Sequence, residues 1–542
     1  MNNFIIKILY LSIILICVIS HSSYSQQQQE WVRQFNSGSN QNDIVTDMKI
    51  DNSGNIYMCG SIEYNSSLKD VLLLKYSSAG NLLWSRTWRG TGMNNTNESS
   101  ASKILFDNEG FIYVLGNTII DSNYLDFLLI KYKTNGDSIW VRTFNGTNGD
   151  VESERDIVID PNNNIYITGL SYRFGSVDNE TVKYDKNGDL KWSKKFNNFS
   201  GGNILLDSGF LYIGGASNYN ISILKYDTSG NSLDTFYCGT EKSDGAQLMV
   251  FDSQENLIVS GLENAGLPTQ LNIVTAKISQ SGIKSWISVF NNNFDNRPEY
   301  LYDLKTDTSG NTLILVRSRN QQNNRGEIAL IKYDSNNGDS IWTRKYNLVP
   351  FSNEEPGKMA IDKDNNIYVI ETSDSSVIFY RIVIIKYNSL GQLQWHKVYY
   401  PSLFSNSYGA CISTDTLGNI YASGITNYAQ TGGDDIVLIK YSVMTEVSEI
   451  NTNLPEKFEL YQNYPNPFNS QTEIKFNLVK SGQYKIEVFD VLGKSVDILF
   501  NGFKNAGSYN LNYNASNLSS GLYFYSLVSS DINIIKKFIL VK

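Results

Sequence analysis

Short apolar runs alternate with clusters of Asp, Asn, Ser and Gly along most of the chain. A ten-residue phrase, DNSGNIYMCG at 51–60, returns as DNEGFIYVLG at 107–116, DPNNNIYITG at 160–169, DKDNNIYVIE at 362–371 and DTLGNIYASG at 415–424. Short apolar and aromatic runs between such turn residues predict β-strands. The recurrence of one phrase at a regular interval predicts a repeat architecture.

Each repeat unit contains four such runs. The unit begins with a short apolar stretch such as DIVTDMKI at 43–50 and continues with the Tyr-containing run of the phrase. A third run ends in Lys-Tyr, as in DVLLLKY at 70–76, and a Gly turn leads to a fourth run with Trp, as in NLLWSRTW at 81–88. Four strands per unit match one blade of a β-propeller.

The number of repeat units follows from how often the opening Asp of the phrase recurs. It recurs at intervals of 45 to 56 residues, at Asp51, Asp107, Asp160, Asp207, Asp252, Asp307, Asp362 and Asp415. Unit four departs from the pattern because Asp234 stands where Trp is expected, and unit five has the divergent phrase DSQENLIVSG. We therefore predict an all-β fold whose main part is an eight-bladed β-propeller over residues 26–441.

The two ends of the repeat region complement each other. The eighth unit stops at Tyr441 without a Trp-containing run, whereas EWVRQF at 30–35 stands alone near the N-terminus. Its Trp31 and Arg33 have the spacing of Trp84 and Arg86. Closing the ring with this strand would remove open sheet edges, which otherwise invite aggregation. We expect residues 30–35 to complete the last blade.

The phrase itself predicts a tight turn. In Asp-x-x-Gly-Asn the carboxylate is expected to accept a backbone N–H two residues on, while Gly adopts a positive φ. This connects the first two strands as a hairpin. DKDNN at 362–366 also resembles the start of a calcium loop, but no unit completes the pattern of such a loop. We therefore assign the phrase to turn formation.

The N-terminus and the charge indicate where the protein acts. Lys7, the apolar residues 8–19 and the small residues around Ser25 predict a signal peptide over 1–25, and no later segment is a candidate membrane span. The net charge is −9. Residues 458–542 hold 8 Lys and 6 Asp and Glu (+2), which leaves −11 for the rest, and neither part has the basic stripe of a nucleic-acid-binding protein. We expect no nucleic-acid partner.

Residues with catalytic chemistry are scarce after residue 25. The one histidine there is His396, in a fourth-strand position, so sites with several histidines are excluded. Cys59, Cys238 and Cys411 are far apart in sequence, have no C-x-x-C spacing and are expected to be buried as small hydrophobes. We therefore expect no catalytic residue, no metal ligand and no cofactor, and a protein that is not an enzyme.

The alternative is a secreted propeller enzyme. A carbohydrate-active hydrolase or lyase could use carboxylates that converge near the ring axis. A quinoprotein-like enzyme is a second form of this alternative, because LIKYKTNGDSIW at 129–140 resembles the Trp-containing repeat of that family. The chain lacks the adjacent Cys pair that those dehydrogenases carry.

The loops between strands predict where a ligand would bind. Because strands alternate in direction, the first–second and third–fourth turns share one end of the ring, the short-turn rim. The second–third and fourth–first connections share the other end, the long-loop rim, and include segments 89–101, 171–179 and 291–301. Loops on a rigid scaffold commonly carry recognition. We predict a glycan or protein ligand there, in a binding, adhesion or surface-layer protein.

The repeat units resemble the β-propeller repeats of the SBBP type, which occur in many large secreted bacterial proteins. The resemblance is carried by the Asp-x-x-Gly-Asn-Ile-Tyr-x-x-Gly phrase and the Gly…Asp segment before it. The family name implies seven blades, whereas this sequence contains eight units.

Residues 458–542 follow a predicted linker at 442–457 and differ from the repeats. Alternating runs between 472 and 541 predict a small Ig-like β-sandwich. The region resembles the type A C-terminal sorting domain of the type IX (Por) secretion system in Tyr464-Pro465-Asn466-Pro467-Phe468-Asn469, Asp490 with Gly493, Gly521 with Tyr523, and Lys536-Lys537-Phe538 to Lys542. The resemblance implies the type IX translocon as a partner and transport through the periplasm. The product would be secreted or displayed at the outer-membrane surface.

Overall fold

The computed structural model describes residues 27–443, 455 and 457–542, apart from gaps at 39–40, 66–67, 91–96, 121–123, 147–150, 174, 241, 265–270, 293–297, 321–322, 324, 350–351, 375–378, 402–404, 429–432, 481, 505–506 and 530–531. All regular elements of this part of the chain are β-strands, which confirms the predicted all-β fold. The predicted signal peptide and most of the predicted linker lie outside the described residues. The chain divides into two compact units, Gln29–Ser442 and a second one that contains Val443–Lys542.

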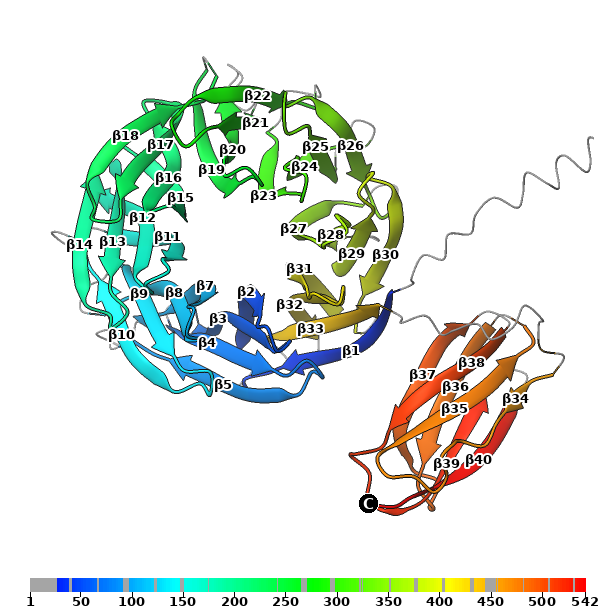
Figure 1. The fold of residues 1–542 in the computed structure, drawn as a ribbon. Helices are drawn as coiled ribbons and strands as arrows, with labels where there is room; N and C mark the ends of the chain where they lie inside the picture. The colour runs from blue at the N-terminus through cyan, green and yellow to red at the C-terminus, as the bar shows by residue number, and fades with distance from the viewer. Residues whose placement is uncertain are drawn as a thin grey trace, which may run out of the picture. The chain divides into compact units, whose positions relative to one another are not determined.

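Gln29–Ser442 form a β-propeller. Its described strands make eight antiparallel sheets of four strands each, and the sheets stand in a ring (Figure 1). One sheet is extended by β6 (Asn97–Glu98), which pairs in parallel with β4. The first strand of each sheet lies nearest the centre of the ring and the fourth strand lies on its circumference (Figure 1).

The strands follow the four runs of the repeat unit. The first strands are β2 (Asn42–Ile50), β7 (Ser100–Phe106), β11 (Val151–Ile159), β15 (Ser200–Asp207), β19 (Asp244–Phe251), β23 (Tyr300–Thr306), β27 (Glu354–Ile361) and β31 (Ser405–Thr414). The second strands are β3 (Ile56–Asn65), β8 (Ile112–Thr118), β12 (Ile165–Arg173), β16 (Phe210–Ser217), β20 (Leu257–Asn264), β24 (Thr312–Arg319), β28 (Ile367–Ser373) and β32 (Ile420–Tyr428).

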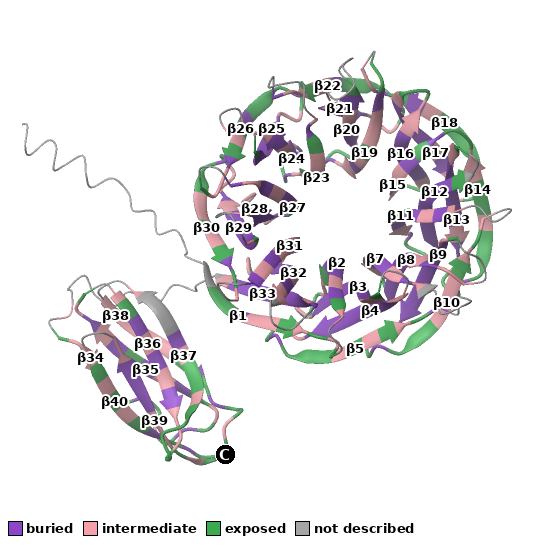
Figure 2. Ribbon diagram, turned by 180° about the vertical axis from the view of Figure 1, so that it is seen from behind, coloured by how far each residue is buried: buried purple, intermediate pink, exposed green. Residues whose placement is uncertain are grey.

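The outer half of each sheet contains the Lys-Tyr run and the Trp run. The third strands are β4 (Leu68–Tyr76), β9 (Asp126–Tyr132), β13 (Ser176–Tyr184), β17 (Asn220–Asp227), β21 (Leu271–Ile278), β25 (Gly326–Tyr333), β29 (Arg381–Tyr387) and β33 (Asp434–Val443). The fourth strands are β5 (Leu82–Trp88), β10 (Ser138–Phe144), β14 (Leu190–Phe196), β18 (Ser232–Tyr237), β22 (Lys284–Phe290), β26 (Ser340–Tyr346), β30 (Leu393–Tyr399) and, for the last sheet, β1 (Gln27–Phe35). Burial is greatest in the second and third strands, between neighbouring sheets (Figure 2).

The repeated phrase forms the turn between the first and second strands. Asp51 Oδ1 accepts the backbone N–H groups of Ser53 and Asn55, both at 2.9 Å, and Gly54 has φ of 77°. The other oxygen, Oδ2, accepts Asn55 Nδ2 at 2.8 Å and the Tyr57 hydroxyl at 3.2 Å. The same four contacts recur in the third, seventh and eighth units. The Asp carboxylate therefore explains why Asn and Tyr recur in the phrase, because both side chains donate to it. The positive φ of the turn explains the recurring Gly.

The phrase ends in Gly because the first strand carries a β-bulge. At Gly60 an added Cβ would lie 1.8 Å from the carbonyl oxygen of Ile44, next to the register shift between Val45 and Asp47. Equivalent close approaches occur at Gly116 and Gly424. In the sixth and seventh units this position is held by Val316 and Glu371 instead.

Neighbouring blades are joined through the Lys and Trp positions. Lys75 Nζ donates to Thr134 O in the next blade at 3.1 Å, and the Trp84 ring lies against Gly136 of the same turn. Arg86 adds a hydrogen bond from Nε to Gly136 O at 2.9 Å. Equivalent lysine bonds follow in the later blades, donated by Lys131, Lys183, Lys225, Lys277 and Lys332.

The last and first blades meet through the same contacts. β1 pairs with β33, so the sheet order is β1-β33-β32-β31. Arg33 Nε donates to Gly80 O at 2.7 Å, Lys440 Nζ donates to Ser78 O at 3.3 Å, and Trp31 packs on Gly80. The N-terminal strand thus occupies the fourth-strand position that the eighth unit lacks.

The two units with unusual sequences also form four-stranded sheets. In unit four, Asp234 occupies the Trp position opposite Lys225, and the aromatic contact moves to Phe236, whose ring lies against Gly282 of the next blade. Phe236 is 7% exposed, so the apolar contact between these blades is kept.

The predicted extent of all three loops is wrong. Residues 100–101 belong to β7, residues 300–301 belong to β23, and segment 171–179 is mainly the ends of β12 and β13. Ser171 and Asn179 are fully buried, and Asn179 Nδ2 donates to Thr168 Oγ1 at 2.7 Å. In the sequence the ends of β12 and β13 resemble loops because they are polar. In the structure polar side chains there are buried and hydrogen-bonded inside the sheet. Residues 91–96, 174 and 293–297 of the predicted loops lie outside the described residues.

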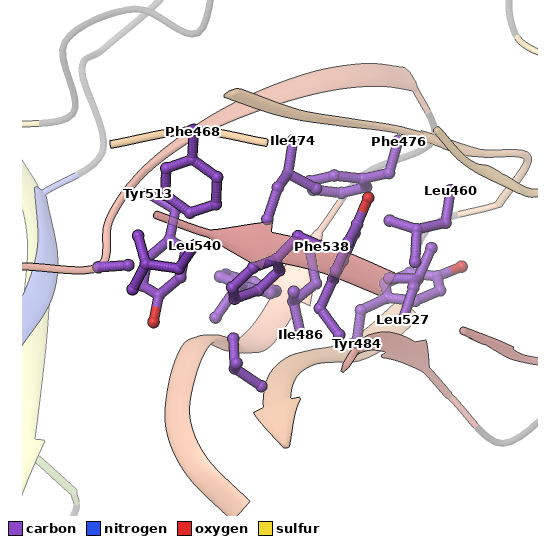
Figure 3. Close-up of a cluster of buried hydrophobic side chains, with 14 of the residues drawn as sticks. Leu460, Phe468, Ile474, Phe476, Tyr484, Ile486, Tyr513, Leu527, Phe538 and Leu540 are labelled. Carbon is purple, nitrogen blue, oxygen red and sulfur yellow. The ribbon is translucent and has the colours of Figure 1, made fainter. Parts of the chain in front are cut away.

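The second unit is a β-sandwich. One sheet has the order β34 (Glu459–Leu460), β35 (Gln471–Leu478), β38 (Gly507–Asn514), and the other has the order β37 (Ser495–Lys504), β36 (Gly482–Phe489), β39 (Gly521–Val528), β40 (Asn533–Leu540). Both contribute to one hydrophobic core around Phe538 (Figure 3).

Candidate binding surface on the long-loop rim

The two rims of the propeller expose different side chains. Among the described residues of the propeller, every exposed tyrosine lies beside a second–third or fourth–first connection: Tyr124, Tyr172, Tyr219, Tyr237, Tyr300, Tyr380 and Tyr400. The short-turn rim instead exposes aliphatic residues such as Leu83, Ile283 and Leu417. Tyrosine offers a large amphipathic surface that loses little conformational entropy on binding, so it favours recognition at the long-loop rim.

The closest aromatic pair on this rim joins blades seven and eight. The Tyr380 and Tyr408 rings have centroids 5.0 Å apart and planes at 33°. The Tyr380 N–H donates to Asn406 Oδ1 at 3.0 Å, and its carbonyl accepts the Ser407 N–H at 3.0 Å. The loop before β29 is therefore held against the first strand of the next blade.

Arg381 fixes the same loop from its other side. Its guanidinium carbon lies 5.1 Å from the centroid of the Tyr400 ring, and Nη1 donates to Ser405 O at 2.7 Å. Arg381 thus contacts the Tyr400 ring, while the neighbouring Tyr380 contacts the Tyr408 ring. This arrangement presents aromatic surface that is already ordered before a ligand binds.

A charged group lies between the sixth and seventh blades, toward the same rim. Arg317 Nε is 3.0 Å from Glu355 Oε2, and Arg317 Nη2 donates to Asn353 Oδ1 at 3.3 Å. The Tyr302 hydroxyl donates to Glu355 Oε1, and burial together with the Glu355 carboxylate raises the pKa of Tyr302. The side chain of Glu355 is 44% exposed, so the group can contact a ligand. We call Tyr302, Arg317, Asn353 and Glu355 the blade 6–7 group.

Neighbouring loop residues support this group. The Asn353 N–H donates to Asp374 Oδ1, and Arg325 Nη1 is 3.6 Å from Asp374 Oδ2. The Gly326 N–H donates to Asn353 Oδ1 at 2.9 Å. The two blades therefore share one polar network where their loops meet.

No site residue was predicted from the sequence, and the blade 6–7 group was missed. The sequence signal was the loss of the terminal Gly in units six and seven, where Val316, the residue before Arg317, and Glu371 stand. His396 lies exposed on β30, with its ring 6.0 Å from that of Tyr346. Burial raises the pKa of the Cys238 and Cys411 thiols to about 12.

Two other features are absent from the described residues. These residues hold no group of three or more His, Cys, Asp or Glu side chains placed to bind a metal ion. They also contain no helix with the length and apolar character needed to span a bilayer.

The short-turn rim carries a hollow of about 530 Å³ among blades two to four. Its lining includes Phe106, Pro161 and Leu206 together with the turn residues Asp107 and Asp160. Both turn carboxylates already accept hydrogen bonds from their own turns. The hollow therefore offers fewer available polar groups than the long-loop rim.

The motifs of the C-terminal unit converge on its last strand. Phe468 is 3% exposed, its ring is 5.3 Å from that of Phe538, and its backbone pairs with Leu540. Asn466 Oδ1 accepts the Ile539 N–H at 2.9 Å, and the Tyr523 ring stacks on Phe538 at 5.3 Å. The motif that opens this unit thus supports β40, the strand that ends it.

The remaining motif residues form turns and anchors. Asp490 Oδ1 accepts the N–H groups of Leu492 and Lys494, and Gly493 has φ of 79°. Lys542 Nζ donates to Ser516 O at 2.6 Å.

Comparisons with known families agree with both units. Residues 462–542 match the family model described as a secretion system C-terminal sorting domain, and residues 30–63 match the model of a β-propeller repeat. The chain therefore carries a β-propeller repeat of the SBBP type and a C-terminal sorting domain of the type IX secretion system. The sorting domain implies interaction with the secretion machinery and a secreted or cell-surface location. No curated protein matches the sequence.

Several solved structures are similar to this chain at low identity. A protein of unknown function from Dyadobacter fermentans has 9% identity and a TM-score of 0.37, with 65% of this chain and 97% of that chain covered. The β-propeller domain of the Trilobed protease from Pyrococcus furiosus has 13% identity and a TM-score of 0.37, with 66% and 98% covered. The polysaccharide lyase Uly1 has 9% identity and a TM-score of 0.39, with 73% and 89% covered.

Proposed function

We propose that this SBBP-type protein is a non-catalytic binding or adhesion protein that engages a surface or extracellular glycan through its long-loop rim. The observation that carries the proposal is the confinement of the exposed propeller tyrosines to that rim, with Tyr380 and Tyr408 in contact. Aromatic rings that stand among Asn and Arg side chains suit a ligand with both apolar and hydroxyl-bearing faces. The protein reaches this ligand after passage through the periplasm and export by the type IX machinery.

The blade 6–7 group supports binding more than catalysis. A general acid or base must be available to the substrate, whereas Glu355 is already held by Arg317 and Tyr302. The nearby Glu354 is buried. We therefore propose that the group selects a ligand by charge and hydrogen bonding, and that it does not carry out a reaction.

A glycan array probed with the mature chain, residues 26–542, tests the proposal. We expect saturable binding to one class of polysaccharide, with the oligosaccharide recovered intact after incubation. Cleavage of a bound glycan would overturn the non-catalytic part and favour the enzyme alternative. Absence of binding to every glycan, together with capture of one secreted protein, would replace the glycan with a protein ligand.

A further inference from the structure

Glu371 is the most unusual residue of the propeller core. It occupies the position that is Gly in six of the eight units, and it is fully buried. Neither of its carboxylate oxygens has a hydrogen-bond partner among the described residues. Burying an unpartnered carboxylate costs several kcal/mol unless it is neutralised.

The sheet register gathers other oxygens beside Glu371. Glu354 in β27 pairs with Ser373 in β28, and Glu371 stands two residues before Ser373 on the same face of that strand. All three residues are fully buried. Glu354 Oε2 and Ser373 Oγ also have no hydrogen-bond partner outside this group in the described part of the chain.

A tyrosine from blade six packs in the same buried cluster as Val369, which lies two residues before Glu371 in β28. Tyr346 is 7% exposed and its hydroxyl has no partner among the residues described. Burial and then the charges of Glu371 and Glu354 raise the pKa of this hydroxyl, so it lies within their electrostatic reach. Five buried oxygens without partners outside this group therefore gather between blades six and seven.

The chain makes room for Glu371 in the facing strand. In the unit with Gly60 the first strand shifts register between Val45 and Asp47, which leaves one residue unpaired. In unit seven the shift runs from Pro356 to Met359, which leaves two residues unpaired. The wider bulge moves the backbone that would otherwise meet a side chain at this position.

We propose that Glu354, Glu371 and Ser373, with the Tyr346 hydroxyl, bind a calcium ion between the sixth and seventh blades. Calcium prefers oxygen ligands and accepts six to eight of them, and its two positive charges balance the two carboxylates. Zinc favours nitrogen and sulfur ligands, which these residues lack. Magnesium usually keeps several waters, which a fully buried site disfavours.

The ion would also stabilise the loop beside the blade 6–7 group. Glu354 Oε1 accepts the Leu348 N–H at 3.0 Å, and the Ser352 hydroxyl donates to the same oxygen. One glutamate therefore holds the loop with one oxygen and would bind calcium with the other. Asn353, the next residue, belongs to the blade 6–7 group.

Two measurements on the mature chain test the site. Its thermal midpoint is measured in calcium and in chelator, and terbium, which binds in place of calcium, is titrated while its luminescence is excited through tyrosine. We expect calcium to raise the midpoint by a few degrees and terbium to saturate one site per chain.

Variants assign the effect to these residues. Glu371→Gln keeps the shape of the side chain and should abolish both signals. If it does not fold, Glu371→Gly, which restores the residue of the other units, should do the same. The control Glu299→Gln removes another buried carboxylate and should leave both signals unchanged. A wild-type protein that is insensitive to calcium and terbium, or a Glu371 variant that still binds them, would overturn the proposal.

Discussion

Removal of the Trp31 side chain should loosen the seam between the last and first blades. Trp31 is 8% exposed, packs on Gly80 and lies 6.3 Å from the Tyr421 ring, measured between centroids. Replacing such a buried tryptophan by alanine costs about 3–5 kcal/mol. Because β1 is covalently attached to the ring only through its C-terminal end, the substitution should mainly lower the free energy of local opening, in which β1 detaches from β33.

Hydrogen exchange measured by mass spectrometry would detect this opening. At about 1.4 kcal/mol per tenfold, Trp31→Ala should speed exchange in β33 by about two to three orders of magnitude. The matched control is Trp84→Ala, which removes a ring from the same position of blade one, where β5 is connected at both ends. It should destabilise its blade without exposing the neighbouring third strand to the same degree. Equal exchange of the two third strands, or an unchanged β33, would refute the closure argument.

Three further predictions concern other parts of the protein. Burial raises the pKa values of Glu154 and Glu299 to about 7, so each carboxyl should lower the free energy of unfolding by up to about 3 kcal/mol as the pH rises from 4.5 to 7. Denaturation of the double Gln variant should show less of this loss, and an unchanged pH profile would count against it. Gly116→Ala places Cβ 1.9 Å from a carbonyl oxygen and should cost about 3 kcal/mol or more, whereas Gly110→Ala, with nothing within 4 Å, should cost about 1 kcal/mol; equal thermal midpoints would contradict this. A chain that ends before Ser442 should stay in the periplasm as a folded propeller, and fractionation that finds it outside the cell would disprove its dependence on the sorting domain.

The repeat and the sorting domain could be predicted because their signals are local. The Asp51 turn is encoded within a few residues, so the phrase itself indicates the hairpin. The need for Gly60 could not be predicted in the same way, since it depends on a bulge in the facing strand. The role of Phe236 was missed for a similar reason, because its partner Gly282 lies in the next blade.

The candidate surface was harder to predict than the fold. Tyr380 and Tyr408 are 28 positions apart in the sequence and meet only when two blades stand side by side. Arg317 and Glu355 likewise come from different units. The sequence could nevertheless have pointed to units six and seven, since Val316 and Glu371 replace a residue whose role is steric.

The most direct test of the proposed function compares glycan affinity between two tyrosine variants of the mature chain. Tyr380→Ala combined with Tyr408→Ala should weaken binding at least about tenfold, because each ring provides ordered contact surface. Tyr219→Ala removes a tyrosine that is 79% exposed on a distant blade of the same rim and should leave affinity unchanged. The account predicts this difference with equal thermal midpoints for all three proteins. Unchanged affinity in the double variant would contradict the assignment of the binding surface.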